Sequence, residues 1–154
     1  MSGIKMSTLS PAYSVTKLPL PVAATSPPSN LLSLFSSELC AASPIIPDPI
    51  FLARTPTEFS VICPTPTLSA LSPQFDEASK ASYVIDDDSW VCFMVHGPMP
   101  FDLVGIMATL SQVLAKASIS LLAQSTFDTD YVIVKAGDAD AAKQAFVDAG
   151  VEWQ

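Results

Sequence analysis

Two segments of this chain carry groups that could hold a small charged molecule. After Gly97-Pro98-Met99-Pro100 an apolar pattern typical of a helix begins, and the first turn of a helix offers free N–H groups and a partial positive charge that favour a carboxylate. Proline lacks an N–H, so the usable donors begin just after Pro100. Asp130, in the acidic segment that follows, could pair with an ammonium group. The pattern therefore predicts a site that holds a free α-amino acid by both of its charged ends, with donors from Phe101, Asp102, Leu103 and Gly105.

A simpler interpretation of the same residues stays open. Asp128, Thr129 and Asp130 are common turn residues, and Asp102 could merely favour the first turn of its own helix. The sequence alone does not decide between a ligand contact and a turn at Asp130.

No pattern in the chain predicts catalysis. Phe127-Asp128-Thr129-Asp130 differs from the Phe-Asp-Thr-Gly motif of aspartic proteases at its glycine and occurs once, whereas two such motifs must share a proton. His96 is the only histidine, and the chain has neither a nucleophile elbow nor a phosphate loop. The Asp86–Asp88 run is typical of a solvated turn rather than a calcium loop. We predict no enzyme activity, no catalytic residue, no metal and no cofactor.

Composition narrows the class of protein further. Hydrophobic residues make up 49% of the 154 residues and charged residues only 14%, which predicts apolar surface covered by a partner subunit. A net charge of −8 and seven scattered basic residues argue against nucleic acid. Cys40, Cys63 and Cys92 show no CxxC spacing and favour reduced thiols. With no apolar run long enough for a membrane span and no secretory leader pattern, we expect a cytoplasmic protein.

The periodicity is clearest from Trp90 onward and predicts a βαββαβ unit. Apolar residues recur at i, i+3, i+4 and i+7 over 101–116, and Gly150 is a suitable stop for a helix over 139–149. Strands are predicted at 91–96, 119–124 and 131–135, with a last short strand at 151–153. This arrangement is ferredoxin-like, with both helices on one face of an antiparallel sheet.

The first half is interrupted by prolines, twelve of the fourteen lying at or before Pro73. It predicts strands over 13–18, 51–54 and 58–63 and a short helix over 31–40, but no full second helix. The predicted fold class is therefore α+β, with two tandem ferredoxin-like units, the first irregular and the second complete. The expected divisions are a mobile lead at 1–12, the irregular unit at 13–73, a linker at 74–89 and the complete unit at 90–154.

The second half resembles the ACT domain family, and in particular the double-ACT subgroup that includes small uncharacterised proteins and cytosolic arginine sensors of the CASTOR type. The resemblance rests on the stretches 97–106, 114–120 and 125–134, with a weaker echo over 51–61. ACT domains are regulatory modules that bind amino acids or similar ligands at interfaces between domains. By position, the resemblance implies ligand contacts for Thr126, Phe127 and Asp130.

Two positions depart from the arginine sensors. Pro100 stands where they have glycine, and Leu103 where they have an acidic residue. Losing that carboxylate removes a partner for a cationic side chain. The resemblance thus implies a non-catalytic regulatory or sensor protein whose ligand is an amino acid, without fixing which one. The alternative is a structural or protein-interaction module that keeps the ACT fold, binds a protein partner and has no metabolite ligand.

The resemblance also bears on assembly. The longer sensors carry four ACT units in one chain and hold ligand where non-adjacent units meet, whereas this chain carries two. An equivalent interface would have to come from a second copy, so we expect a homodimer.

Overall fold

The computed structural model describes residues 3–9, 12–19, 48–75, 83–96 and 104–154. It divides the chain into two compact units. The discontinuous unit combines Met1–Ala12 with Asp88–Gln154, and the inserted unit spans Tyr13–Asp87. The fold class is α+β, with two ferredoxin-like units, as predicted.

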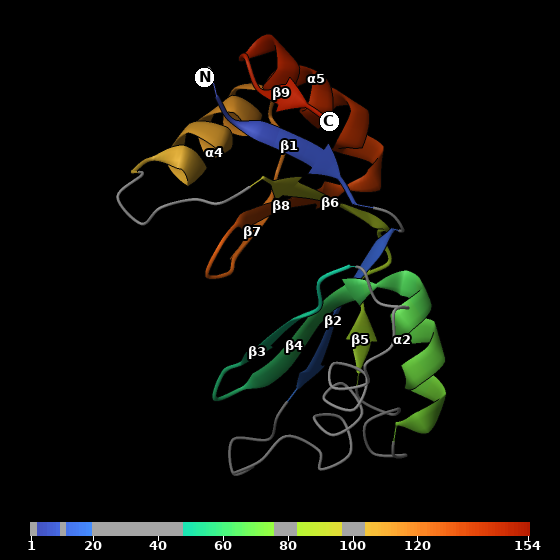
Figure 1. Cartoon of the computed structure of the whole chain (residues 1–154). Coiled ribbons are helices and arrows are strands. Elements are labelled where there is room, and N and C mark those ends of the chain that lie inside the picture. The colour runs from blue at the N-terminus through green and yellow to red at the C-terminus, as the bar shows by residue number, and fades with distance from the viewer. Residues whose placement is uncertain (1–2, 10–11, 20–47, 76–82, 97–103) are drawn as a thin grey trace. The chain divides into compact units, whose positions relative to one another are not determined.

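The discontinuous unit is built on a sheet in the order β7-β8-β6-β1-β9 (Figure 1). Its strands are β1 (Lys5–Thr8), β6 (Trp90–Val95), β7 (Leu122–Ser125), β8 (Asp130–Lys135) and β9 (Glu152–Trp153). Neighbours pair antiparallel except β1 and β9, which run parallel. Without β1, this is the strand order of a ferredoxin-like unit, and the predicted antiparallel arrangement of its three principal strands is confirmed.

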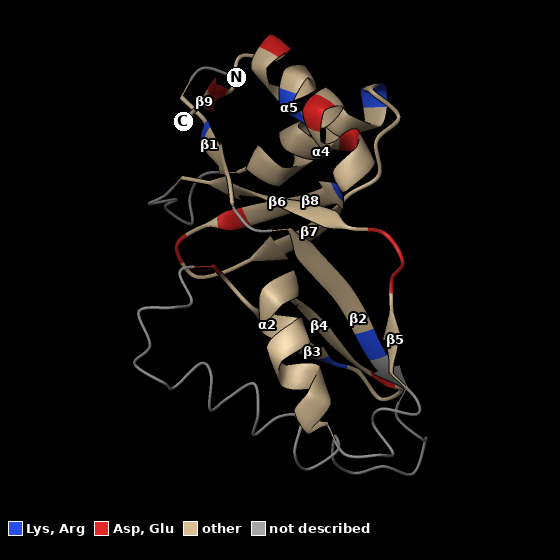
Figure 2. Cartoon of the chain, turned by 90° about the vertical axis from the view of Figure 1, so that its right-hand side faces the viewer, with Lys and Arg blue, Asp and Glu red and all other residues tan. Residues whose placement is uncertain are grey.

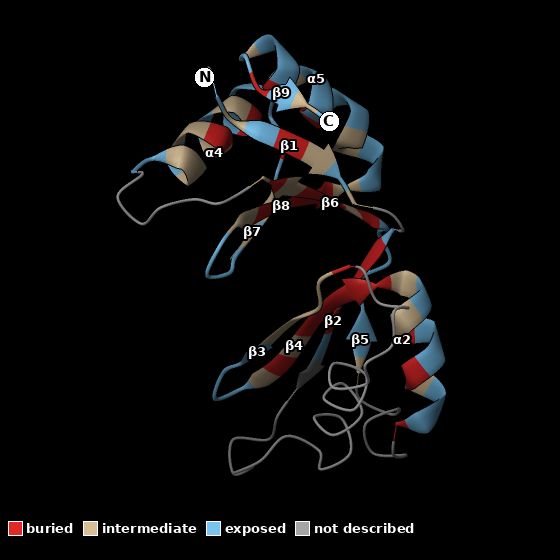
Figure 3. Cartoon of the chain, viewed as in Figure 1, coloured by how far each residue is buried: buried red, intermediate tan, exposed pale blue. Residues whose placement is uncertain are grey.

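Both long helices, α4 (Ile106–Lys116) and α5 (Ala139–Asp148), cover one face of this sheet, as predicted. Leu110 and Leu114 of α4 and Phe146 of α5 are fully buried in the same cluster as Phe93 and Val132, which pair across β6 and β8. The Phe93 ring meets the Phe146 ring edge-on at 6.2 Å between centroids. Aromatic pairs in this geometry add stabilisation beyond their buried area. Figure 3 shows the buried residues along β6 and β8.

Charge is sparse on these central strands. The charged residues of β8 are Asp130 and Lys135, at its two ends, while the four residues between them are buried. Figure 2 shows most of the other charges on helices, at strand ends and in connections, with one basic segment within β2 of the inserted unit. This pattern suits strands whose interiors lie within the core.

Helices α4 and α5 end in the same way. Gly150 has a φ of 89° and follows α5, where the Val151 N–H donates to the Phe146 carbonyl at 3.0 Å. Ser118 has a φ of 58° after α4, and the Ile119 N–H donates to the Leu114 carbonyl at 2.9 Å. These bonds satisfy carbonyls that the helix leaves open. The cap also explains why β7 begins at Leu122 rather than at the predicted residue 119.

The N-terminal lead differs from the prediction. Residues 1–12 were expected to be mobile, but Lys5–Thr8 forms β1 between β6 and β9, with Met6 at 0% exposure. The polar residues around Met6 concealed a strand that has only one inward-facing apolar side chain. The complete unit predicted at 90–154 thus also contains a strand from the beginning of the chain.

The inserted unit has a sheet in the order β3-β4-β2-β5, all antiparallel. Its strands are β2 (Tyr13–Pro19), β3 (Phe51–Arg54), β4 (Glu58–Pro64) and β5 (Val84–Ile85). The predictions for the first three strands are confirmed within one residue. The helix predicted over 31–40 lies outside the described residues.

Two expectations for this unit were wrong. The stretch predicted to lack a second helix contains α2 (Thr65–Leu71) and the 3-10 turn η1 (Ser72–Gln74). Pro66 lies in the first turn of α2, where a missing N–H costs nothing, and Leu68 and Leu71 bury one side of the helix. The linker expected at 74–89 contains β5, which pairs with β2 and completes the ferredoxin-like strand order.

Candidate ligand sites

The hairpin between β7 and β8 carries three of the predicted ligand residues. The Thr126 N–H and hydroxyl both donate to the Thr129 carbonyl, at 2.8 and 3.1 Å, and so close the turn. The Thr129 hydroxyl donates to the Val95 carbonyl at the end of β6. The structure therefore brings the hairpin beside the end of the strand that leads toward α4.

Asp130 is partly buried at the first position of β8, opposite Ser125. The Ser125 hydroxyl donates to its Oδ1 atom. Because a carboxylate can accept about four hydrogen bonds, this contact leaves acceptor capacity for a ligand. The contact also orients Asp130 within the turn, so the structure is compatible with both interpretations of this residue.

Phe127 and Thr126 differ in their surroundings. The Phe127 side chain is 76% exposed at the tip of the hairpin. The Thr126 side chain forms a hydrogen bond with Tyr131, a residue that the sequence analysis did not single out. Burial, together with the nearby Cys92, raises the pKa of the Tyr131 phenol, and the bond with Thr126 partly opposes this rise. Tyr131 is therefore protonated at neutral pH.

The predicted helix start lies elsewhere. Phe101, Asp102 and Leu103 lie outside the described residues, and α4 begins at Ile106 rather than at 101. Gly105 precedes it with a φ of 85°, a left-handed conformation that excludes it from the helix and favours glycine. Its carbonyl accepts bonds from the N–H and hydroxyl of Thr109, at 2.9 and 2.7 Å. The free amide donors of this helix therefore begin at Ile106.

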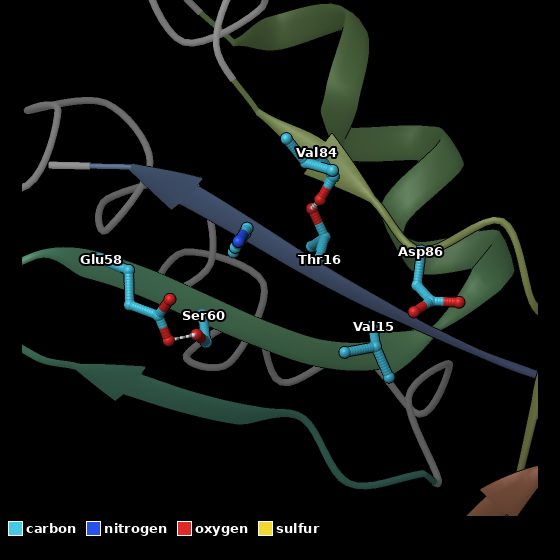
Figure 4. A pocket seen from close by; sticks show the side chains of 7 residues that line it. Val15, Thr16, Glu58, Ser60, Val84 and Asp86 are labelled. Atoms are coloured by element: carbon cyan, nitrogen blue, oxygen red, sulfur yellow. Dashed lines mark hydrogen bonds between the residues drawn. The ribbon is translucent and has the colours of Figure 1, made fainter.

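A second site, which the sequence analysis did not predict, lies entirely within the inserted unit. It is a pocket of about 400 Å³ on strands β2, β4 and β5 (Figure 4). Its lining combines one cation, two carboxylates, two hydroxyl side chains and two valines: Lys17, Glu58, Asp86, Thr16, Ser60, Val15 and Val84. The alternation in β2 and β4 was visible in the sequence, but the pairing that brings these residues together was not.

Within the part of the chain that the structure describes, no group of three or more His, Cys, Asp or Glu residues is placed to hold a metal ion. None of the helices described there has the length and apolar character needed to cross a bilayer. The two described cysteines, Cys63 and Cys92, are buried thiols that are not joined in a disulfide, and burial raises the pKa of Cys63 to about 12.

Comparison with known proteins supports the fold and identifies an ACT-like segment. Residues 86–148 match the model of the ACT domain. No curated protein matches the chain. Solved structures do: protein Atu0741 of Agrobacterium tumefaciens aligns with a TM-score of 0.67 at 22% identity, over 98% of this chain and 92% of that one.

Two further structures come from aspartate kinases. The regulatory subunit of the Thermus thermophilus enzyme, in its ligand-free form, aligns with a TM-score of 0.64 at 14% identity, over 90% of this chain and 93% of that one. The Clostridium acetobutylicum aspartate kinase, an allosteric enzyme, aligns at 0.67 and 14% identity, over 96% of this chain but 34% of that one. At these identities the likeness shows the fold. The match to the ACT domain model covers residues 86–148, which is less than half of the chain.

Proposed function

We propose that this protein is a non-catalytic regulator that binds a free α-amino acid at an ACT domain or subunit interface. The observation that carries the proposal is the ACT match over residues 86–148, which includes β6, α4 and the β7–β8 hairpin. Regulatory proteins with this fold, such as the aspartate kinase subunit, support a ligand-dependent role. Buried reduced cysteines favour a cytoplasmic location.

In this proposal Asp130 binds the ligand's ammonium group. Thr126 and Phe127, in the hairpin, line the same site. Backbone N–H groups at the start of α4 bind the ligand's carboxylate. Phe101, Asp102 and Leu103 stay in the proposed site as the donors that the sequence predicts just after Pro100. Because Leu103 replaces the sensors' acidic residue, we do not propose arginine as the preferred ligand of this hairpin site.

A thermal-shift screen against the twenty amino acids tests the proposal. A specific ligand at 100 times its dissociation constant stabilises the folded protein by about 2.7 kcal/mol. Replacing Asp130 by Ala should then weaken binding by about 1.5–3 kcal/mol, the range for a hydrogen bond to a charged group. Asp128→Ala, in the same hairpin, is the matched control. If both variants bind the ligand as tightly as the unchanged protein does, Asp130 belongs to the turn and not to the site.

We also propose a homodimer that completes this interface, with a buried area of at least about 1,000 Å². Light scattering at micromolar concentration, with and without ligand, should give twice the chain mass. A monomer under both conditions would count heavily against the interface.

One observation favours the alternative function, a protein-interaction module without a metabolite ligand. Val104 is 90% exposed and Phe127 is 76% exposed, although both are apolar. If no amino acid shifts the melting temperature and Phe127→Ser disrupts the dimer, the interaction module becomes the better assignment.

A further inference from the structure

The pocket of the inserted unit lies on the face of its sheet that α2 does not cover. Phe59, Val61 and Cys63 of β4 pack in one cluster with Leu68 and Leu71 of α2. Successive residues of a strand point to opposite faces, so Glu58 and Ser60 belong to the other face. Among the described elements no helix packs there, and this is where the pocket opens.

Strand pairing brings the polar groups of this face together. Lys17 pairs with Ser60 on β4 and with Val84 on β5, which places these three side chains in one row across the sheet. The next row contains Val15 and Asp86, since the Asp86 N–H donates to the Val15 carbonyl at 2.9 Å. Figure 4 shows Glu58 and Asp86 at opposite ends of the pocket, on either side of β2.

Two side-chain hydrogen bonds hold the framework of the pocket. The Ser60 hydroxyl donates to one Glu58 oxygen at 2.8 Å and orients that carboxylate. The Thr16 hydroxyl donates to the Val84 carbonyl at 2.8 Å and ties β5 to β2. Lys17 is exposed and forms no ion pair with any described residue.

The charge pattern specifies the complementary ligand. One cation between two carboxylates matches a molecule with one carboxylate and two positive groups. The apolar lining from Val15 and Val84 suits a methylene chain. A volume of about 400 Å³ lies within the usual range of small-molecule sites.

We propose that this pocket binds a basic α-amino acid. Lys17 binds its carboxylate, Glu58 binds its α-ammonium group and Asp86 binds the cation at the end of its side chain. The site lies in the inserted unit and is independent of the hairpin site proposed above, so each can fail without the other.

The first experiment titrates the full-length, isotope-labelled protein with L-lysine and follows its amide resonances. Two analogues each lack one charge: L-norleucine lacks the terminal ammonium group, and cadaverine lacks the carboxylate. We expect L-lysine to shift resonances of β2, β4 and β5, and each analogue to bind about tenfold more weakly or worse. Shifts confined to residues 125–130, or no shifts at millimolar L-lysine, would overturn the proposal.

Variants then assign the charges. Lys17→Gln, Glu58→Gln and Asp86→Asn should each weaken L-lysine binding about tenfold, while the exposed controls Lys116→Gln and Asp87→Asn should not. Norleucine affinity should be insensitive to Asp86→Asn, and cadaverine affinity to Lys17→Gln, because those analogues lack the group concerned. Equal losses for all three ligands in both variants would overturn the assigned orientation.

Asp130→Ala distinguishes the two sites. It should leave the L-lysine response of β2, β4 and β5 unchanged. Loss of that response in Asp130→Ala, with the response retained in Lys17→Gln, would place L-lysine at the hairpin and overturn the inference for the inserted unit.

Discussion

The two units reach the same strand order with different amounts of buried structure. Among the described residues, the discontinuous unit buries side chains from two helices and from β1, β6 and β8 in one cluster. The described cluster of the inserted unit is smaller and combines β4 with one seven-residue helix and Phe75. The larger cluster lies in the unit that contains the family match, while the described pocket lies in the other unit. The larger buried cluster and the described pocket therefore lie in different copies of the repeated fold.

The largest expected effect is the loss of stability when a side chain is removed from the core of one unit only. Phe146 is fully buried against Phe93 and Trp153, so Phe146→Ala should destabilise the discontinuous unit by about 3–5 kcal/mol. Hydrogen exchange should show faster opening of β6 and β8. If the amides of β2 and β4 accelerate equally, the two units unfold as one and the comparison fails.

A somewhat smaller effect tests whether β1 belongs to the discontinuous unit. Met6 is at 0% exposure and packs with Phe93 and Val95, so Met6→Ala should cost about 2–4 kcal/mol. Urea unfolding measures this loss. Lys5→Ala, next to it in the same strand and exposed, is the control and should change stability by less than about 1 kcal/mol. If both variants lose the same small amount of stability, residues 1–12 are better described as the mobile lead that the sequence predicts.

The inserted unit should show its own dependence on pH. Burial raises the folded-state pKa of Cys63 from 9.0 to about 12, so folding favours the protonated thiol. This contribution is fully present below pH 9 and is lost as pH rises from 9 toward 12. Chemical denaturation from pH 8 to 10.5 should show a loss of stability that Cys63→Ala reduces. Rapid alkylation of Cys63 in the native protein at pH 8 would contradict its burial.

The smallest effects concern the ends of α4. Gly105→Ala should cost about 1–2 kcal/mol because Gly105 has a φ of 85°, whereas Gly137, which is not in that conformation, is the control. Ser118→Gly should stabilise the protein by up to about 1 kcal/mol, since Ser118 holds a φ of 58° that Gly150 adopts after α5. Thermal unfolding resolves both changes. If alanine at Gly105 and alanine at Gly137 change the stability equally, the backbone conformation of Gly105 is not the cause of the loss.

Sequence reasoning worked best where periodicity was strong. The stripe over 101–116 predicted α4 and its buried face, and alternation predicted β2, β3 and β4 almost to the residue. It failed where one tertiary contact decides the local structure. The strand at Lys5–Thr8 contains a single buried apolar residue, and α2 begins among prolines that suggested a loop. Tertiary pairing outweighed local preference in both places.

The site was harder to predict than the fold. The sequence identified a hairpin with a carboxylate, but not the bonds by which Ser125 and Tyr131 engage Asp130 and Thr126. It also missed Lys17, because the role proposed for this residue depends on which strands lie beside β2. Strand register is a long-range property that a local pattern does not encode.

The position of β1 has a consequence for how the chain folds during synthesis. The inserted unit is continuous in sequence and can be complete once Asp87 has left the ribosome. The discontinuous unit begins earlier and finishes later, because β1 pairs with Glu152–Trp153, which are made almost 150 residues afterwards. β1 can pair with β6 as soon as Trp90–Val95 have been made, and its pairing with Glu152–Trp153 completes the sheet last. The order of synthesis therefore favours assembly of the inserted unit first, with closure of the other unit as the final step.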